Sequence, residues 1–398
     1  MSDTLIATIG SSAHPDPTQA GREAAETAQG ELSSLQPRLA IVFGSSWFNQ
    51  EALLQGVHTS LGSIPIVGES TAGEILSEGP TSHSCIVVLL ASHSLTFSIG
   101  MGEEIHQTPR KAGQRAAHTA MREFPGGPRA GCLLFGDGLV TGYADVVRGV
   151  QEVLGTEALI VGGMAGDDFR LLRTSQYFNG RVLTHAVVAL LLGRPFKIGT
   201  GIEHGFAPIS RPRQVTRAQA NILYELDQQP AAAVYEEYFG HDLVQQMQQD
   251  GLTRQGIAYP LGLQGTTADQ WLLRNVLSFG TDGSLRCSGE ILEGAWLQLM
   301  MGSRELAIDA ARRAAQQAIR SVNRVACVLL FDSVVRRRLL GPRHAAMEIA
   351  SIRETIGPSI PLAGCYTYGE HAPADLASSS LERIGIQTGS ILVVALGV

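Results

Sequence analysis

Paired cysteines, an excess of positive charge and long apolar runs are all missing from this chain of 398 residues. The cysteines are an odd number with no two close in sequence: Cys85, Cys132, Cys287, Cys327 and Cys365. We expect buried free thiols in a reducing compartment. No apolar run approaches the ~20 residues that a spanning helix needs, and the first residues do not resemble a signal peptide. A soluble, cytoplasmic protein is expected.

The sequence also lacks the motifs of common nucleic-acid, nucleotide and metal sites. The net charge of −7 gives no general attraction to nucleic acid or to an anionic membrane. The one basic run, Arg336–Arg338, is short and has no interleaved aromatics, so we expect no nucleic-acid partner. There is no phosphate-binding G-x-x-x-x-G-K-[ST] motif, and Gly199–Gly205 has the wrong spacing for a dinucleotide site. Neither H-E-x-x-H nor C-x-x-C is present, and we predict no metal site.

What the chain does contain is one short motif made three times. Pro65–Glu74 and Pro361–Glu370 both read Pro, two apolar residues, Gly, two free positions, Thr, one free position, Gly, Glu. A shorter relative lies at Ile160–Asp167. Each starts as an apolar strand and ends in glycines that allow close backbone approach, followed by a carboxylate. Repetition of this kind indicates a repeated scaffold.

The surrounding sequence repeats with the motif. The order strand, helix, strand, helix, strand, strand is expected over residues 1–93, 94–197 and 295–398, where Ala295–Met301 is the predicted first strand of the third copy. Residues 198–294 have a different texture, with short strands, two helices and a hairpin signal at Asp282–Gly283. We therefore predict an α/β fold of three related β-α-β-α-β-β units with an inserted α+β subdomain.

Two nucleophiles lie in the motifs. Ser70, within Gly68–Ala72, approximates the G-x-S-x-G elbow of hydrolases, but turn residues follow it where the elbow requires a helix. Cys365 lies in a Gly-rich turn where backbone N–H groups can activate a thiolate. The alternative for Ser70 is a serine in an ordinary turn, and the alternative for Cys365 is a small residue lining a pocket wall. No recognisable base accompanies either one.

Two histidines and one arginine complete the candidates. His204 and His371 are near predicted loops, where either can be an axial haem ligand or simply a hydrogen-bonding group. Arg336 follows an apolar strand, near the strand end where α/β sheets bind ligands. It can pair with a carboxylate in bidentate fashion, or it can lie on a solvated helix face.

The three motif copies, at Val67–Glu74, Val161–Asp168 and Gly364–Glu370, resemble the FIST family, a bacterial sensory module. The resemblance extends over nearly the whole chain. It implies a FIST N-like domain over residues 1–197 and a FIST C-like part made of the insertion and the third unit. Where relatives often carry Ser-Cys-x-x-Arg, this chain has Asp332–Arg336, so that cysteine is absent while Arg336 fits the family's arginine.

The resemblance implies an intracellular signal-transduction role in which a small ligand is bound, amino acids being among those proposed. Some relatives look like haem proteins that sense nitric oxide and partner histidine kinases. We therefore expect a sensory module that is not an enzyme, needs no cofactor and signals through a partner protein such as a histidine kinase. A haem-based nitric-oxide sensor and an enzyme using Cys365 or Ser70 are the alternatives.

The predicted ligand pocket is where the three motifs converge. Its acids can receive an ammonium group and Arg336 a carboxylate. The predicted pocket residues are Gly68, Ser70, Thr71, Gly73, Glu74, Gly163, Gly166, Asp167, Arg336, Cys365, Tyr366, Thr367, Tyr368 and Glu370.

Overall fold

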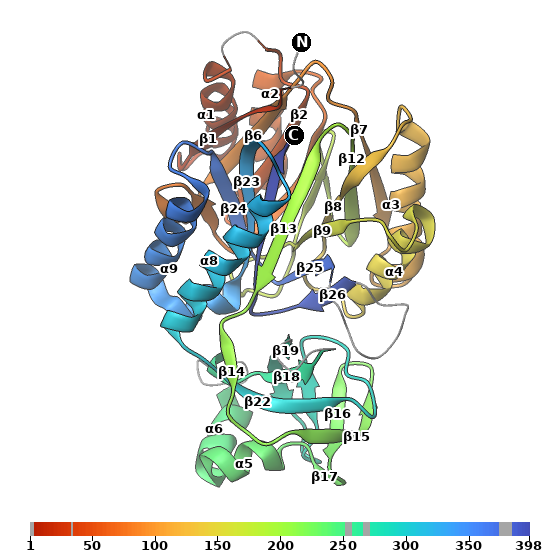
Figure 1. The fold of residues 1–398 in the computed structure, drawn as a ribbon, viewed down its shortest axis with the longest axis vertical. Helices are drawn as coiled ribbons and strands as arrows, with labels where there is room; N and C mark the ends of the chain where they lie inside the picture. Colours follow the sequence, from red (N-terminus) through yellow and green to blue (C-terminus); the bar gives the residue numbers. More distant parts are fainter. Residues whose placement is uncertain (1–3, 33–34, 251–256, 266–270, 374–383) are drawn as a thin grey trace.

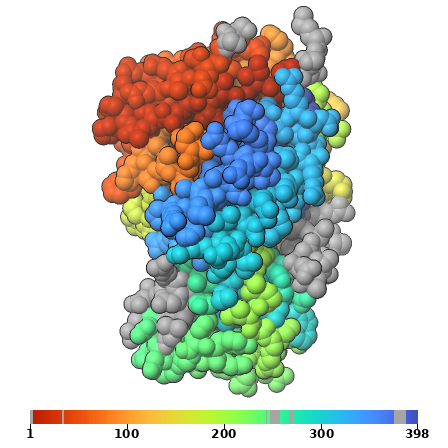
Figure 2. Space-filling model, turned by 60° about the vertical axis from the view of Figure 1, so that its left-hand side comes forward, coloured from red at the N-terminus to blue at the C-terminus, as the bar shows by residue number. Residues whose placement is uncertain are grey.

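The computed structural model of the protein describes residues 4–32, 35–250, 257–265, 271–373 and 384–398. These residues form a larger body around three six-stranded sheets and a smaller part around a nine-stranded sheet (Figure 1). Both chain ends lie at the end of the larger body that is remote from the smaller part. Figure 2 shows the first unit (red to orange) beside the third (blue), with the inserted part (green) at the opposite end.

The first unit has two helices and six strands. In chain order they are β1 (Ile6–Ser12), α1 (Pro17–Gly30), β2 (Leu39–Ser45), α2 (Gln50–Leu61), β3 (Ile66–Thr71), β4 (Glu74–Leu76), β5 (Gly79–Thr81) and β6 (Cys85–Ala91). Local sequence sets the helix starts: Asp16 and Asn49 accept backbone N–H bonds as N-caps, and Pro17 occupies the first turn of α1.

The second unit repeats the same series. Its elements are β7 (Phe97–Glu103), α3 (Pro109–Glu123), β8 (Arg129–Gly136), α4 (Tyr143–Leu154), β9 (Ile160–Met164), β10 (Gln176–Phe178), β11 (Arg181–Leu183) and β12 (Ala186–Gly193). The third unit consists of β13 (Lys197–Glu203), α8 (Arg304–Arg320), β23 (Val325–Ser333), α9 (Val334–Ile356), β24 (Leu362–Thr367), β25 (Gly369–Pro373), β26 (Ile384–Gln387) and β27 (Ile391–Gly397).

The inserted part interrupts the third unit between β13 and α8. It contains β14 (Phe206–Pro208), β15 (Arg213–Gln219), β16 (Ile222–Leu226), β17 (Gln229–Pro230), α5 (Ala233–Phe239), α6 (His241–Asp250), β18 (Leu261–Gln264), β19 (Trp271–Arg274), β20 (Val276–Phe279), β21 (Leu285–Cys287) and β22 (Trp296–Gly302). Its strands form the nine-stranded sheet over a core of their own.

Each unit gives a two-stranded hairpin to the sheet of another unit. The β4–β5 hairpin of the first unit pairs with β24 of the third. The β10–β11 hairpin of the second pairs with β3 of the first, and the β25–β26 hairpin of the third pairs with β9 of the second. The exchange closes on itself, so that each of the three sheets holds four strands from one unit and two from another.

The three sheets share one core and carry their helices outside. Alternate residues of each strand point inward and join a single apolar cluster that contains Phe43, Phe135 and Phe331. The ring centroid of Phe331 lies 6.0 Å from that of Phe43 and 6.2 Å from that of Phe135. The outward-facing residues pack against the helix pairs α1–α2, α3–α4 and α8–α9. Strands with both faces covered explain the fully apolar runs in the sequence.

A glycine is required where each motif strand lies beside its parallel neighbour. A Cβ on Gly68 would lie 1.9 Å from the carbonyl oxygen of Val42, and the backbone there has φ +150°. The same contact recurs at Gly162 with Leu134 (2.0 Å) and at Gly364. The first glycine of the motif therefore serves strand packing before any chemistry.

The predicted fold class is confirmed, with one change in strand membership. The three repeated α/β units and the inserted subdomain are present, and all five cysteines are free and buried as predicted. The expected first strand of the third unit, Ala295–Met301, instead corresponds to β22, which pairs with β14, β15 and β18 in the inserted sheet. The first strand of the third unit is β13, which pairs with β27. The unit boundaries themselves remain a proposal.

Among the described residues, no helix combines the length and the apolar character that crossing a membrane requires.

The glycine contact gives a stability prediction. We expect Gly68→Ala to lower the free energy of unfolding by about 3 kcal/mol, because the added methyl overlaps a backbone oxygen that cannot move. Gly30→Ala, at the end of α1 with nothing within 4 Å of the added Cβ, is the matched control; it should be neutral or stabilising by up to about 1 kcal/mol. Urea unfolding measures both, and equal stability of the two variants would contradict the packing argument.

Candidate functional site

The three motifs meet at the centre of the molecule as three equivalent cross-strand pairs. Within each motif, one residue lies opposite a residue at the start of a hairpin donated by another unit. The three pairs are Cys365 with Glu74, Glu69 with Gln176, and Gly163 with Glu370. We call these three pairs the motif ring. A side-chain contact also links two of them, because the Cys365 thiol donates to Glu69 Oε1 at 3.8 Å.

Two of these positions hold fully buried acids in the same setting. Glu370 accepts hydrogen bonds from the hydroxyls of Thr367 (2.6 Å) and Ser390 (2.5 Å). Glu74 accepts from the hydroxyl of Thr71 and from the hydroxyl and backbone N–H of Ser84, at 2.7 and 3.0 Å. In the first and third units, therefore, the Thr of the motif donates its hydroxyl to the Glu three residues later.

Burial sets the charge of these acids. It raises the pKa of Glu74 to about 7 and that of Glu370 to about 8, against hydrogen bonds that lower both. Burial also raises the pKa of Glu69 well above its usual range. At neutral pH the Glu370 carboxyl is mostly protonated and that of Glu74 about half protonated. Glu69, Glu74 and Glu370 have no exposed surface, so they are poorly suited to receive an ammonium group from solvent.

In the second unit the equivalent of these acids is Gln176. The sequence comparison pairs Asp167 with Glu74 and Glu370, yet strand register places Gln176 opposite Glu69, where the other units have glutamate. The signal is hidden because Ala165–Ser175 lengthens the turn between β9 and β10. Gln176 is fully buried, and its amide makes no hydrogen bond to the described residues.

Asp167 instead organises this longer turn, the loop 165–175. Its Oδ1 accepts from the Leu171 backbone N–H at 2.9 Å and from the Tyr368 hydroxyl. Its Oδ2 accepts from the backbone N–H groups of Leu172 (2.7 Å) and Arg173 (3.0 Å). Asp167 is therefore saturated by the protein.

Ser70 fixes both ends of the same loop. Its hydroxyl donates to the Gly166 carbonyl at 3.0 Å and accepts from the Ser175 backbone N–H at 2.9 Å. Gly166 lies so close to the end of β3 that a Cβ there would be 2.7 Å from that of Ala72. Among the described residues no base contacts the Ser70 hydroxyl, whose hydrogen bonds hold the loop.

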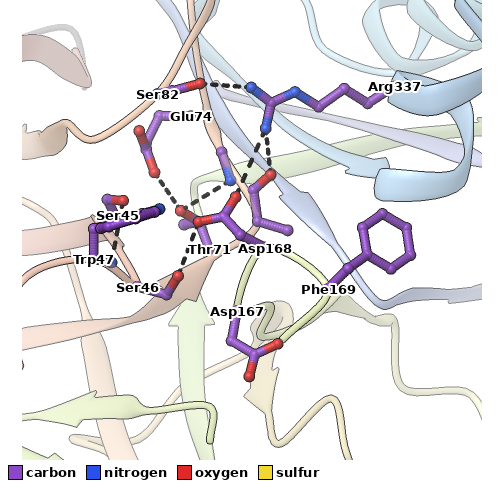
Figure 3. A network of polar contacts seen from close by, with 12 residues as sticks. Ser45, Ser46, Trp47, Thr71, Glu74, Ser82, Asp167, Asp168, Phe169 and Arg337 are labelled. Atoms are coloured by element: carbon purple, nitrogen blue, oxygen red, sulfur yellow. Dashed lines mark hydrogen bonds and ion pairs between the residues drawn. The ribbon is translucent and has the colours of Figure 1, made fainter. Parts of the chain in front are cut away.

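The accessible charges lie one residue beyond those predicted. Asp168, next to Asp167, accepts from the Ser46 hydroxyl at 3.0 Å and faces Arg337 across 4.0 Å (Figure 3). About a quarter of each of the two side chains is exposed. Arg337 also donates to the Ala72 carbonyl and, at 2.6 Å, to Ser82.

The motif residues shape this edge, which we call the three-unit edge: Ser46, Ser82, Asp168 and Arg337. Arg337 crosses Gly73, where a Cβ would lie 1.9 Å from its guanidinium, and it stacks 4.8 Å above the ring of the buried Tyr366. Tyr368 accepts from the Phe169 backbone N–H at 2.7 Å. Residues from all three units thus meet at one surface.

Arg336 is occupied inside the protein. It is fully buried and donates to Asp332 (2.9 Å), Glu348 and the carbonyls of His204 (2.6 Å) and Ala307 (2.9 Å). It ties β23, α8, α9 and the turn after β13 together. Removing one member of such a buried ionic cluster costs about 3–5 kcal/mol.

Cys365 is not activated in this arrangement. Burial, together with Glu69, raises the pKa of its thiol well above the usual value, so the reactive thiolate is disfavoured. The two candidate haem ligands do not fit a porphyrin as they lie. Burial lowers the pKa of His371 to about 3, and its Nε2 is 3.0 Å from the Cβ position of Gly162. His204 accepts from the Phe206 backbone N–H with Nδ1, and neither histidine lines the two hollows described below.

Two hollows lie away from the motif ring. One of about 320 Å³ lies between the inserted part and the third unit, against Ser303 and Arg338. The other, of about 850 Å³, lies in the second unit beside His106 and His185. These two histidines and Asp137 form a group of potential metal ligands, which the sequence analysis did not anticipate.

Two family models together match most of the chain, between residues 38 and 373. The FIST N domain matches residues 38–229 and the FIST C domain residues 231–373. The chain belongs to the FIST family. FIST domains are associated with sensory signal transduction.

Individual relatives are distant. An uncharacterized protein of Methanocaldococcus jannaschii is 28% identical over 166 residues, which are 39% of this chain and 32% of that protein. The match thus spans about a third of that relative. Among solved structures, a cyanuric acid hydrolase aligns with 99% of both chains at 11% identity and a TM-score of 0.37. Thermotoga maritima phosphoribosylformylglycinamidine synthase II aligns with 99% of this chain and 72% of its own, at 13% identity and a TM-score of 0.23.

One expectation from the sequence is corrected by these comparisons. The chain was expected not to be an enzyme, but the solved structures that align with it include enzymes, the cyanuric acid hydrolases. The exclusion of catalysis is therefore withdrawn. At TM-scores of 0.30 and 0.37 the likeness assigns no activity to this chain.

The buried acids give a pH prediction. Because the folded pKa of Glu370 exceeds the unfolded value, the folded state holds a proton that the unfolded chain loses, and its contribution to stability declines as the pH rises toward and through 8. Glu370→Gln, the residue that the second unit carries at this position, removes that decline. Between pH 6.5 and 8.5 we expect the wild type to lose on the order of 2 kcal/mol more than the variant. Unfolded histidine also titrates at the lower end of this range, but it does so equally in the wild type and the variant, so it cancels in the difference.

Urea unfolding at pH 6.5, 7.5 and 8.5 measures the effect. The exposed Glu354→Gln on α9 is the matched control and should keep the wild-type pH dependence. Identical pH slopes for the wild type and Glu370→Gln would refute a buried, proton-holding carboxyl at this position.

Proposed function

We propose that this protein is a sensory module that binds a small zwitterionic metabolite, an amino acid being the first candidate, at the three-unit edge. The observation that carries the proposal is the loosely paired Asp168 and Arg337, opposite charges at the end of parallel strands. Open α/β sheets bind ligands outside the carboxyl ends of their strands. The membership of the chain in a family associated with sensory signal transduction supports the same role.

The charges suit a zwitterion. Asp168 can receive an ammonium group, and the planar guanidinium of Arg337 can bind a carboxylate through two parallel hydrogen bonds. Their present separation of 4.0 Å is at the outer limit of an ion pair. A partly exposed pair at this separation contributes little, about 0–1 kcal/mol, so a ligand that takes its place loses little from the ion pair itself.

Aromatic rings near the charges can cover an apolar ligand side chain. Phe169 follows Asp168, with the Arg338 guanidinium 3.8 Å from its ring centroid. Trp47, beside Ser46, is largely exposed and carries Arg170 5.5 Å from its ring. Rings flanked by arginines offer apolar area without a buried charge.

The edge is also placed to transmit a change. The first unit contributes Ser46 and Ser82, the second Asp168 and the third Arg337, so one ligand would contact all three. The loop between them is strained, with positive φ at Asp168, Phe169 and Leu171, and strained backbone persists at switch regions. We propose that the loop's shift reaches a partner protein, a histidine kinase being the class that the family resemblance suggests.

A thermal-shift screen with the twenty proteinogenic L-amino acids tests the ligand. At least one should raise the melting temperature by about 2–5 °C at saturating concentration. Asp168→Asn and Arg337→Gln should each reduce the affinity at least tenfold, because each removes one charged partner of the zwitterion.

Arg343→Gln makes the same charge change at an exposed position of the same helix and is the matched control. It should bind as the wild type does. The proposal fails if no amino acid gives a saturable shift, or if both edge variants keep the wild-type affinity.

A further inference from the structure

Three side chains of the second unit converge at the end of β8. Asp137 directly follows that strand, His106 lies in the turn between β7 and α3, and His185 directly precedes β12. One ligand atom from each residue lies within 4.8 Å of the other two. Because the residues come from three separate segments, with His106 and Asp137 31 positions apart, no linear motif marks them.

The carboxylate of Asp137 is buried and oriented. Its Oδ1 accepts from the Thr174 hydroxyl at 2.7 Å and from the Leu139 backbone N–H at 2.9 Å. Its Oδ2 is thereby aimed at His106 Nε2, 2.9 Å away. An outer group that holds one oxygen while the other is presented is the arrangement in which metal-binding carboxylates are usually found.

The two imidazoles stand at the surface beside it. The ring centroids of His106 and His185 are 4.4 Å apart, edge to face. Both rings line the hollow of about 850 Å³, together with Glu103, Glu104 and His118. An ion can therefore enter from solvent, and the hollow can supply water or a small ligand to it.

Comparison of equivalent positions shows how this arrangement differs between the three units. His185 is equivalent to His83 and Gly389, and all three have positive φ, 53°, 54° and 79°. A left-handed backbone is cheapest for glycine, so the imidazole at 185 is kept at a conformational cost. Asp137 is equivalent to Ser45 and Ser333, since each donates its backbone N–H to the residue that follows the positive-φ position. Among the residues that the structure describes, the second unit is the one that gathers two histidines and an aspartate here.

We propose that His106, Asp137 and His185 bind a divalent first-row transition-metal ion, Zn²⁺ being the reference case. Two imidazole nitrogens and one carboxylate oxygen form a donor set of open sites, which leave a position for water or a ligand. Ligands about 2.0–2.1 Å from a tetrahedral ion lie about 3.3 Å apart, so the 2.9 Å contact between His106 and Asp137 needs to open only slightly. The ion's position beside the hollow leaves its open coordination position accessible to water or a small ligand.

The test uses the full-length protein after treatment with a chelator. Titration with Co²⁺ should give one saturable set of visible d–d bands per chain, and calorimetry with Zn²⁺ should give the same stoichiometry. His185→Gly places the third unit's residue in the turn, so it should fold at least as well as the wild type. Its Zn²⁺ affinity should fall at least tenfold, as should that of His106→Ala.

His83→Gly makes the same change at the equivalent turn of the first unit, where the ring centroid lies 4.6 Å from that of Trp47. It should retain the wild-type affinity. Absence of saturable Co²⁺ bands from the wild type would contradict the proposal. The cluster would then be only a hydrogen bond beside a contact between two rings. Unchanged Zn²⁺ affinity in both His106→Ala and His185→Gly would place the metal elsewhere and overturn the proposal.

Discussion

The exchange of hairpins between units is the constraint on which the rest of the structure depends. Each motif strand has one side paired within its own unit, to a parallel neighbour, and the other side paired to a hairpin from another unit. No unit completes its sheet alone, so the edges that would otherwise remain open are satisfied only when all three are folded together. The close-packed motif glycines, such as Gly68, follow from the first pairing, and the buried Glu74 and Glu370 follow from the second.

The sequence predicts the repeats because their signals are local. Apolar strands, alanine-rich helices and the Gly-Glu motif recur at similar spacing, and strand and helix periodicity can be read without knowing any partner. Hairpin exchange cannot be read in this way, since pairing between units is a long-range property. The same limit explains the strand Trp296–Gly302, whose apolar pattern suits either sheet and which tertiary pairing assigns to the inserted part.

At the candidate site, residues predicted from the sequence lie next to those of the proposed three-unit edge. The sequence identifies the motif acids and the basic run, but a shift of one position separates the buried Asp167 and Arg336 from the accessible Asp168 and Arg337. Sequence periodicity cannot tell which of two neighbouring residues is exposed here. Asp168 lies in a loop with positive φ, and Arg337 lies in the first turn of a helix. Gln176 was missed since the lengthened loop hides its equivalence to the two glutamates.

The loop 165–175 joins the two proposed sites physically. Its middle is held by Asp167, its ends by Ser70, and the adjacent Thr174 donates to the Asp137 carboxylate of the histidine cluster. An ion bound through Oδ2 of Asp137 would fix the carboxylate that accepts this hydrogen bond and so restrain one end of the loop, while a ligand at Asp168 would act on the other. Two ligands that order the same segment each lower the cost of ordering it for the other. Coupling between metal and metabolite therefore needs no conformational path longer than this loop.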